Sequence, residues 1–369
     1  MVLKTEVLQE VCKSILIAVD NQQLNLVSEV IELTLKDSVF TINTTNKEYF
    51  VSTNFNVDLP NESFHAVVNA SLFLNLVAKL TTEKVELTVD GNSLSISSNG
   101  KYRVPIIFED DHMVELTPIV INNETANFKI KNEILQSIFN YNSKELLKAT
   151  APSPANSLYY VDNEGCITYN SGACVNTFTL PSPIKILLQD KVVKLFKLFK
   201  DEEINFRLGF DELGEIIQTK IELKDSTTTL SAILSDSAYL AWIPVDAIRN
   251  TANSDYLYSM VIDKEEMLSS ISRLKLFSGD SNKSVKLLFD INKNTIDIWD
   301  IDRVNHETLT LNNEITNLDT TYTCVLYCSD IELTIKNCPD KYLTLKFGNG
   351  QSIVVDRNNI KNVITESIQ

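Results

Sequence analysis

Apolar and polar residues follow the same order three times along this chain. In each copy, a short apolar helix pattern leads into a charged turn, an alternating strand, a tight turn and further strands. The copies begin with the segments SLFLNLVAKL, KVVKLFKLFK and DIELTIKNC. Taking Val85, Ile204 and Leu343 as equivalent, they lie 119 and 139 residues apart. This spacing predicts a repeated domain, because solenoid units are only about 20–50 residues long.

A second type of amphipathic helix alternates with these copies. Glu6–Ala18, Asn132–Asn142 and Lys264–Phe277 each place apolar residues at i, i+3, i+4 and i+7. Amphipathic helices followed by strands occur in any α+β protein, but recurrence in all three thirds of the chain favours a repeat. We therefore predict an α+β fold with six half-units, each a helix followed by strands.

The predicted domains are 1–120, 121–252 and 253–369. Their boundaries fall in polar or proline-bearing stretches near Thr117–Ala126 and Arg249–Asp255. Tight turns are expected inside each domain, because Asp-Gly and Gly-rich pairs tolerate the positive φ of hairpin turns. The predicted turns are Asp90-Gly91-Asn92, Asn292–Asn294 and Gly348–Gly350.

Length and cysteine content add limits. The 369 residues hold no secretion signal pattern and no apolar run near 18 residues, so we expect a soluble, cytoplasmic protein that does not enter membranes. Reduced thiols are expected, and the absence of a CxxC pair disfavours zinc. The six cysteines are Cys12, Cys166, Cys174, Cys324, Cys328 and Cys338.

Candidate catalytic residues are few. The three histidines, His65, His112 and His306, lie far apart, with no nucleophile signature around them. Asp297, Asp300 and Asp302 could be imagined as metal ligands. Strand alternation puts Asp300 and Asp302 on one face and Asp297 on the other, so a solvated strand edge is the better interpretation. The sequence predicts neither an enzyme nor a cofactor.

Charge is distributed unevenly. The formal net charge is −16, which by itself argues against nucleic acid. The six candidate helices are 6–17, 70–80, 131–148, 184–200, 264–275 and 329–337. Together they carry +5, so the remainder carries −21. Positive helices within an acidic chain predict a surface that contacts phosphates without reading bases, while the rest of the molecule repels DNA.

The most basic run is KVVKLFKLFK. In an α-helix, lysines three residues apart drift by about 60° at each step, so we expect two or three of these four to face DNA. One such helix alone would be an ordinary solvated face. The predicted DNA-contacting residues are Lys79, Lys191, Lys194, Lys197, Lys200, Arg273 and Lys275.

The chain resembles the bacterial-type sliding clamp, the β subunit of the replicative DNA polymerase III. The stretch Asn69–Ile107 is similar in pattern to the second half of that family's first domain. Asp236–Pro244 (DSAYLAWIP) stands where the family has a Phe-Pro-Asp-Tyr segment. The resemblance implies three clamp domains with helices inside and sheets outside, closing into a ring as a head-to-tail homodimer. The implied partners are double-stranded DNA, the polymerase and the clamp loader.

The chain departs from the family at the pocket that binds partner peptides. Residues 170–175 keep only the glycine and an aliphatic residue of the Thr-Asp-Gly-His-Arg-Leu signature. Ser237 and Ala241 replace the pocket proline and arginine, and the tail differs, with Val354 and Val355 as the nearest counterparts. The ring is therefore expected to be retained and the peptide site rebuilt. This fits a virus-encoded clamp that serves its own polymerase, or a clamp from a fast-evolving bacterium.

The resemblance gives six candidates for a partner-peptide pocket: Asn170, Gly172, Val175, Ser237, Trp242 and Val354. Trp242 stands where the family has a small aliphatic residue, and aromatic anchors dominate binding at such sites. Alternatively, Trp242 fills the domain core beside Tyr239.

Ring geometry is consistent with a DNA clamp. Two chains would supply twelve helices, which at about 10 Å spacing form a circle about 38 Å across, leaving about 28 Å free for duplex DNA. Two alternatives stay open. One is a clamp-fold platform that binds proteins without encircling DNA, and the other is a β-rich structural protein such as a virion component.

Overall fold

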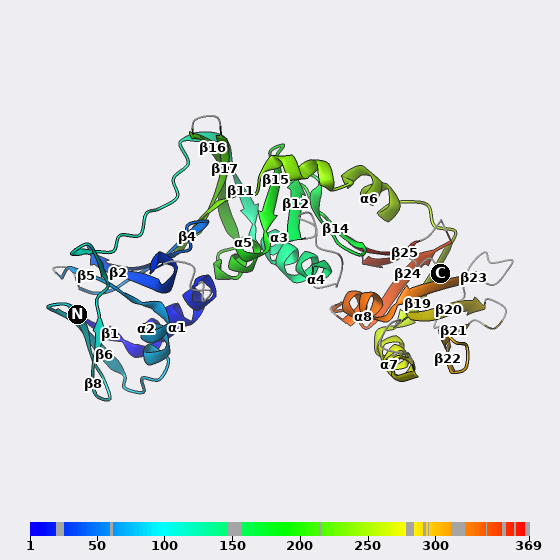
Figure 1. The fold of residues 1–369 in the computed structure, drawn as a ribbon, viewed down its shortest axis with the longest axis horizontal. Coiled ribbons are helices and arrows are strands. Elements are labelled where there is room, and N and C mark those ends of the chain that lie inside the picture. Colours follow the sequence, from blue (N-terminus) through cyan, green and yellow to red (C-terminus); the bar gives the residue numbers. More distant parts are fainter. Residues whose placement is uncertain are drawn as a thin grey trace. The chain divides into compact units, whose positions relative to one another are not determined.

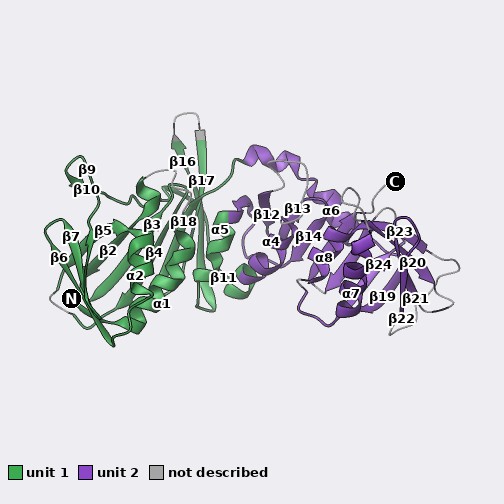
Figure 2. Cartoon of the chain, turned by 60° about the horizontal axis from the view of Figure 1, so that its bottom comes forward, with its two compact units in different colours: residues 1–135, 191–236 green, residues 136–190, 237–369 purple. Residues whose placement is uncertain are grey.

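Figure 1 shows the fold in a computed structural model, and both its helices and its sheets confirm the predicted α+β class. The structure describes residues 1–19, 26–59, 62–146, 157–213, 216–277, 284–290, 293, 295–310, 322–336, 338–348, 352–357 and 359–365. The chain divides into two compact units, unit 1 (residues 1–135 and 191–236) and unit 2 (residues 136–190 and 237–369), which Figure 2 colours separately.

The strands of unit 1 are β1 (Val2–Lys4), β2 (Val30–Lys36), β3 (Val39–Thr45), β4 (Tyr49–Asn56), β5 (Phe64–Asn69), β6 (Lys84–Asp90), β7 (Ser93–Ser97), β8 (Lys101–Pro105), β9 (Phe108–Glu109), β10 (His112–Met113), β11 (Asn123–Lys131), β16 (Glu203–Leu213), β17 (Ile216–Lys224) and β18 (Thr228–Ile233). Its helical segments are α1 (Thr5–Ile15), η1 (Leu16–Ala18), η2 (Leu26–Glu29), α2 (Ala70–Val77) and η5 (Leu195–Leu198). Helices α3 (Asn132–Ser137) and α5 (Asp190–Lys194) span the division between the units.

The strands of unit 2 are β12 (Leu158–Asp162), β13 (Gly165–Tyr169), β14 (Ala173–Thr177), β15 (Lys185–Gln189), β19 (Tyr258–Asp263), β20 (Ser284–Asp290), β21 (Thr295–Asp300), β22 (His306–Thr310), β23 (Tyr322–Tyr327), β24 (Tyr342–Phe347), β25 (Ser352–Arg357) and β26 (Ile360–Thr365). Its helical segments are η3 (Ile138–Asn142), α4 (Ser143–Glu145), η6 (Ser237–Trp242), α6 (Val245–Ala252), α7 (Lys264–Leu274), η7 (Lys275–Phe277) and α8 (Cys328–Lys336).

Four-stranded antiparallel modules are the building blocks of the described sheets. One kind has the orders β1-β6-β7-β8, β11-β16-β17-β18 and β19-β24-β25-β26, and the other has β5-β2-β3-β4, β15-β12-β13-β14 and β23-β20-β21-β22. In unit 1, β18 pairs with β4, and in unit 2, β14 pairs with β26, which fuses modules into eight-stranded sheets. Each eight-stranded sheet thus joins strands from two of the predicted domain ranges, and the three-domain division itself stays a prediction.

The threefold repeat recurs as strand register. Val85 lies opposite Leu3, Ile204 opposite Ile130 and Leu343 opposite Ile262. The residue before each second strand also accepts a backbone hydrogen bond from the start of a helix. The three N···O distances are 3.0 Å for Thr5 to Glu83, 2.8 Å for Asn132 to Glu202 and 2.9 Å for Lys264 to Lys341. The equivalence of Val85, Ile204 and Leu343 in the sequence is therefore confirmed.

The predicted Asp90-Gly91-Asn92 turn is confirmed. Asp90 pairs with Ser93, so a two-residue loop joins β6 to β7, and Gly91 has φ +58°, which glycine adopts without steric strain. The other two predicted turns lie largely outside the described residues, with only Lys293 and Gly348 described.

Three helix predictions need correction. Residues 185–189, predicted as helical, form β15, because this short apolar run is buried on both faces of a sheet, and such runs fit a strand as well as a helix. The predicted helix 131–148 begins at Asn132 and passes through the π-helical segment η3. The expected linker 249–255 is helical in its first half, where α6 continues to Ala252.

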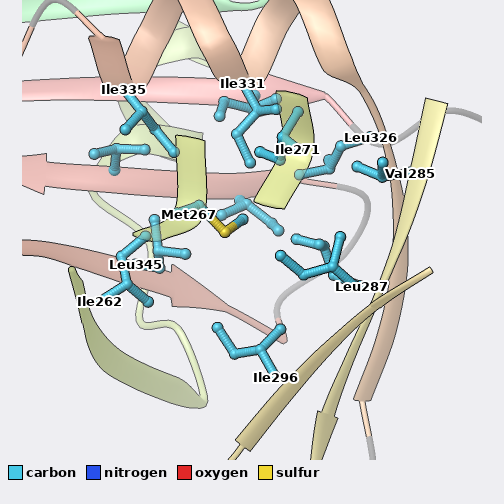
Figure 3. Packing of buried hydrophobic residues seen from close by; sticks show 14 of the residues in the cluster. Ile262, Met267, Ile271, Val285, Leu287, Ile296, Leu326, Ile331, Ile335 and Leu345 are labelled. Carbon is cyan, nitrogen blue, oxygen red and sulfur yellow. The ribbon is translucent and has the colours of Figure 1, made fainter. Parts of the chain in front are cut away.

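The largest core of unit 2 lies between α7, α8 and the strands beside them (Figure 3). Met267 and Ile271 on α7 meet Ile331 and Ile335 on α8, and all four side chains are buried. The amphipathic pattern of this helix is therefore confirmed as far as Leu274. No helix in the described ranges is long and apolar enough to cross a lipid bilayer.

Candidate functional site

The lysines of α5 and η5 form a row on the surface of unit 1. Lys194, Lys197 and Lys200 are exposed, while both residues between successive lysines are buried. Residues 195–198 form a 3-10 helix, in which residues three apart lie on one face. The predicted 60° drift is therefore wrong for this half of the segment. The stripe stays straight because the helix tightens to three residues per turn.

Two lysines at the ends of this segment pair with carboxylates from the first 50 residues. Lys191 forms an ion pair with Glu48, which precedes β4. Lys200 Nζ lies 2.6 Å from Oε1 of Glu10 on α1. Both acceptors belong to the part of unit 1 that carries β4, so the lysine segment is held to the module on the other side of the β18–β4 junction.

The predicted cations of unit 2 are also engaged. Arg273 binds Glu307 of β22 with a fork, at 2.6 Å from Nε and 2.5 Å from Nη2. The hydrogen bond and charge of this arginine hold the pKa of Glu307 below its usual value. Lys275 Nζ lies 2.6 Å from Glu332 Oε2 on α8. Lys79, just past the end of α2 in unit 1, is exposed. The assignment of all seven residues to DNA stays a prediction.

Two of the predicted pocket residues are core residues. Val354 is 0% exposed, and Val175 is also buried, and both belong to one apolar cluster with Ile243 and Ile248. Strand alternation turns these side chains under η6 and α6, so they cannot contact a peptide in this conformation. Asn170 and Gly172 are buried as well. We therefore place these four residues in the framework beneath the surface.

Gly172 is a packing glycine. A Cβ atom at this position would lie 2.2 Å from the carbonyl oxygen of Val363 in β26. Its N–H donates to Glu145 Oε1 at 3.2 Å, and Asn170 Nδ2 donates to the Glu145 carbonyl at 3.1 Å. This glycine therefore permits the close approach of β14 and β26 at their junction.

Trp242 lies on the surface. Its side chain is 57% exposed and makes an edge-on contact with Tyr239, with ring centroids 6.1 Å apart. Tyr239 and Leu240 pack on the apolar cluster beneath, and Ser237, at the start of η6, is exposed. The alternative that Trp242 fills the core is therefore wrong, because its neighbours occupy that space.

The structure adds a polar cluster that the sequence interpretation missed. Arg249 Nη2 on α6 lies 2.6 Å from Asp162 Oδ1, and Arg249 Nη1 lies 3.2 Å from Glu164. Tyr160 donates to Asp162 at 2.9 Å. The cluster borders an open hollow of about 800 Å³ beside η6 and α6. It was missed because α6 was taken as a linker.

Two further polar sites have structural explanations. The predicted solvated position of Asp300 is wrong, because this carboxylate is buried and accepts hydrogen bonds from the N–H groups of Val304 and Asn305 at 2.8 and 3.1 Å. The six cysteines are buried thiols, and burial raises the pKa of Cys12 to about 12. Within the described residues, no group of three acidic, histidine or cysteine side chains is placed to hold a metal.

Comparison with known proteins now fits this architecture. Residues 1–112 match the family described as DNA polymerase III beta subunit, N-terminal domain. No curated protein matches the chain. Among solved structures, the DNA polymerase III subunit beta of Pseudomonas aeruginosa is 12% identical, with a TM-score of 0.78 and 100% of both chains covered. The chain has the sliding-clamp fold.

Two more structures extend this likeness across bacteria. The sliding clamp of Bacillus subtilis is 14% identical with a TM-score of 0.76, covering 100% of this chain and 98% of that one. The beta subunit of Thermotoga maritima is 15% identical with a TM-score of 0.77, covering 100% and 99%. At such identities the similarity of whole chains establishes the fold, while the family match is confined to the N-terminal clamp domain.

The Arg249 cluster predicts a pH-dependent contribution to stability. Burial alone would raise the pKa of Asp162, but hydrogen bonds from Arg249, the Glu164 N–H and Tyr160 outweigh it and lower the pKa below its usual 3.8. We expect Asp162→Asn to lower the free energy of unfolding by about 2 kcal/mol at pH 7. Because the folded pKa is depressed, this difference should persist down to about pH 4 and shrink below it. Denaturant unfolding across pH measures the effect.

The exposed Glu164→Gln is the matched control, with an expected change below about 0.5 kcal/mol. A wild-type advantage over Asp162→Asn that stays constant well below pH 4 would contradict the assignment.

Proposed function

We propose that this chain is a DNA sliding clamp, a non-enzymatic processivity factor that closes around duplex DNA as a homodimer. The observation that carries the proposal is the rule by which the sheets are joined. The last strand of one module pairs with the last strand of the facing kind of module, as β18 does with β4 and β14 with β26. Among the described strands, β8 and β22 occupy the same two positions and have a partner on one side only.

The same rule applied between copies pairs β8 of one chain with β22 of another. This contact is heterologous, and with three domains in each chain it closes after two copies. Exposed apolar residues accompany both edges. Phe108 follows β8 closely in sequence, and Leu276, at 81% exposure, and Phe277 lie just beyond α7, which is tied to β22 through Arg273 and Glu307. Covering these side chains favours association.

The exposed lysine row of α5 and η5 supports the proposed DNA contact. Evenly spaced ammonium groups neutralise phosphates without reading base edges, which suits a protein that slides. The net charge of −16 keeps DNA away from the remaining surface. The polymerase and the clamp loader are the proposed protein partners in the cytoplasm, and the exposed Trp242 and Tyr239 are the proposed contact for a partner peptide.

Ring closure predicts that the edge of β22 is required for dimers. Asp300 N–H donates to Asn305 C=O, so antiparallel alternation leaves the N–H of Thr308 on the free edge. Thr308→Pro should remove one intersubunit hydrogen bond and convert a particle of twice 41.6 kDa into monomer. Light scattering measures the mass.

Thr308→Val is the control, because it keeps the N–H and the strand preference, and it should remain dimeric. A dimeric Thr308→Pro protein with an unchanged melting temperature would rule out this edge as the interface.

DNA encirclement predicts retention by topology. The wild-type protein should stay on closed circular DNA and leave linear DNA through its ends. Replacing both Lys194 and Lys197 with glutamate should lower retention on circles and flatten its salt dependence by about 0.9 in log–log slope for each phosphate that is no longer neutralised. Gel filtration of protein–DNA complexes at several salt concentrations measures both quantities.

Equal release from circles and linear DNA would leave the protein-binding platform as the better function. Retention unaffected by the double glutamate variant would remove these lysines from the DNA contact.

The exposed tryptophan predicts a partner contact that is separable from stability. Trp242→Ala should weaken binding of the C-terminal peptide of the cognate polymerase by about tenfold or more, since aromatic anchors contribute at least about 1–2 kcal/mol. Its melting temperature should hardly change, because the side chain is largely outside the core. Calorimetric titration with the peptide tests this, with Ser237→Ala as a surface control. Preserved affinity together with a large fall in melting temperature would refute it.

A further inference from the structure

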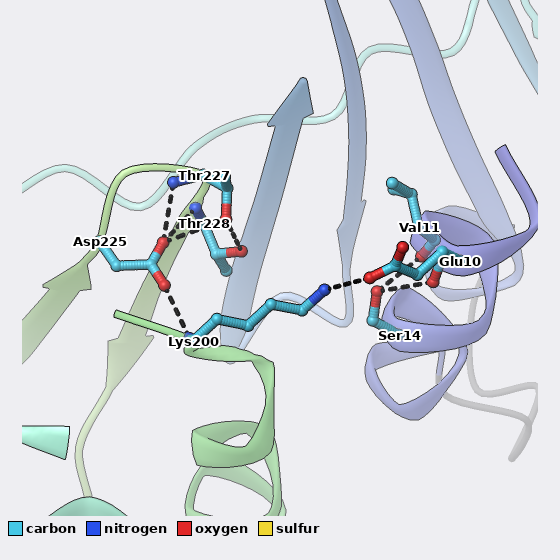
Figure 4. A network of polar contacts seen from close by, with 7 residues as sticks. All are labelled: Glu10, Val11, Ser14, Lys200, Asp225, Thr227 and Thr228. Carbon is cyan, nitrogen blue, oxygen red and sulfur yellow. Dashed lines mark hydrogen bonds and ion pairs between the residues drawn. The ribbon is translucent and has the colours of Figure 1, made fainter. Parts of the chain in front are cut away.

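Lys200 is held at its backbone by a buried acid. Its N–H donates to Asp225 Oδ2 at 3.0 Å, and Asp225 is only 7% exposed (Figure 4). The other oxygen of Asp225 accepts from the N–H groups of Thr227 and Thr228 at 2.9 and 2.6 Å. The base of the lysine side chain is therefore fixed at the β17–β18 turn, and the rest of it extends over the surface.

The far end of this side chain is already occupied by an internal anion. Lys200 Nζ lies 2.6 Å from Glu10 Oε1 on α1, and the two side chains are 61% and 69% exposed (Figure 4). The hydrogen bond and charge of Lys200 lower the pKa of Glu10, so this carboxylate is ionised at neutral pH. An ion pair this exposed contributes little to stability, and another anion can replace either partner readily.

We propose that Glu10 acts as an internal stand-in for a DNA phosphate, occupying Lys200 until the sugar–phosphate backbone displaces it. This inference rests on the proposed clamp function. Each displacement exchanges one carboxylate–ammonium contact for one phosphate–ammonium contact, so the net gain on binding DNA is small. The released carboxylate also remains beside the phosphate and repels it. Glu10 therefore weakens the grip of the lysine row, which favours sliding over fixed attachment.

Residue Glu6 provides a matched comparison. It lies four residues before Glu10 on α1, so both project from similar faces of the helix, and it is exposed. Glu6→Gln removes the same charge from the same helix without releasing Lys200. Any long-range effect of lowering the negative charge should therefore appear equally in Glu6→Gln and Glu10→Gln.

The test measures binding of the full-length protein to a short random-sequence duplex by fluorescence anisotropy between 50 and 200 mM salt. Glu10→Gln should bind about threefold more tightly than Glu6→Gln at the low-salt end, with a log–log salt slope steeper by about 0.9. Lys200→Gln should bind about threefold more weakly than wild type, and the double variant Glu10→Gln with Lys200→Gln should match Lys200→Gln alone.

The possible failures are distinguishable. Wild-type protein that neither binds the duplex nor stays on closed circles would overturn the clamp function itself. Wild-type binding with Glu10→Gln equal to Glu6→Gln would overturn only the role of Glu10. A large loss of thermal stability in both Glu10→Gln and Lys200→Gln, with unchanged DNA affinity, would make the pair a structural tie and also overturn the inference.

Discussion

Backbone hydrogen bonding between neighbouring modules, at the β18–β4 and β14–β26 junctions, is the constraint on which the rest of the structure depends. An unpaired strand edge leaves a row of N–H and C=O groups open, and both junctions satisfy such rows with the next module. The junction in unit 1 also fixes the charged surface, because Lys191 and Lys200 pair with Glu48 and Glu10 across it. In unit 2, Gly172 lets β14 and β26 approach closely. Sheet pairing therefore determines which helices become neighbours.

The repeated fold was predictable because its signals are local. Alternation around Val85, Ile204 and Leu343, and the turn at Gly91, are set by residues close in sequence. The errors arose where tertiary context decides. Residues 185–189 form a strand because β12 offers a partner, and residues 195–198 tighten into a 3-10 helix that straightens the lysine row. No pattern within either segment encodes those outcomes.

The partner site was less predictable than the fold for a different reason. A resemblance transfers positions along a chain, but it carries no information about exposure. Val175 and Val354 align with pocket residues, yet both support η6 and α6 from below. Trp242 lies at the surface because Tyr239 and Leu240 already fill the space beneath it. The Arg249–Asp162 cluster had no sequence signal, since its members come from a helix and a strand that are far apart in the chain.

Counting charge by element found the basic surface but overstated how much of it is available. At least four of the seven predicted DNA-contacting cations, namely Lys191, Lys200, Arg273 and Lys275, already contact carboxylates. A ring that holds DNA by topology has no need of strong contacts, and strong contacts would slow its movement along the duplex. Because counterion release rises with each phosphate neutralised, internal carboxylates that compete for the lysines lower both affinity and salt dependence. The acidic composition of the chain thus acts on the DNA-facing surface itself as well as on the exterior.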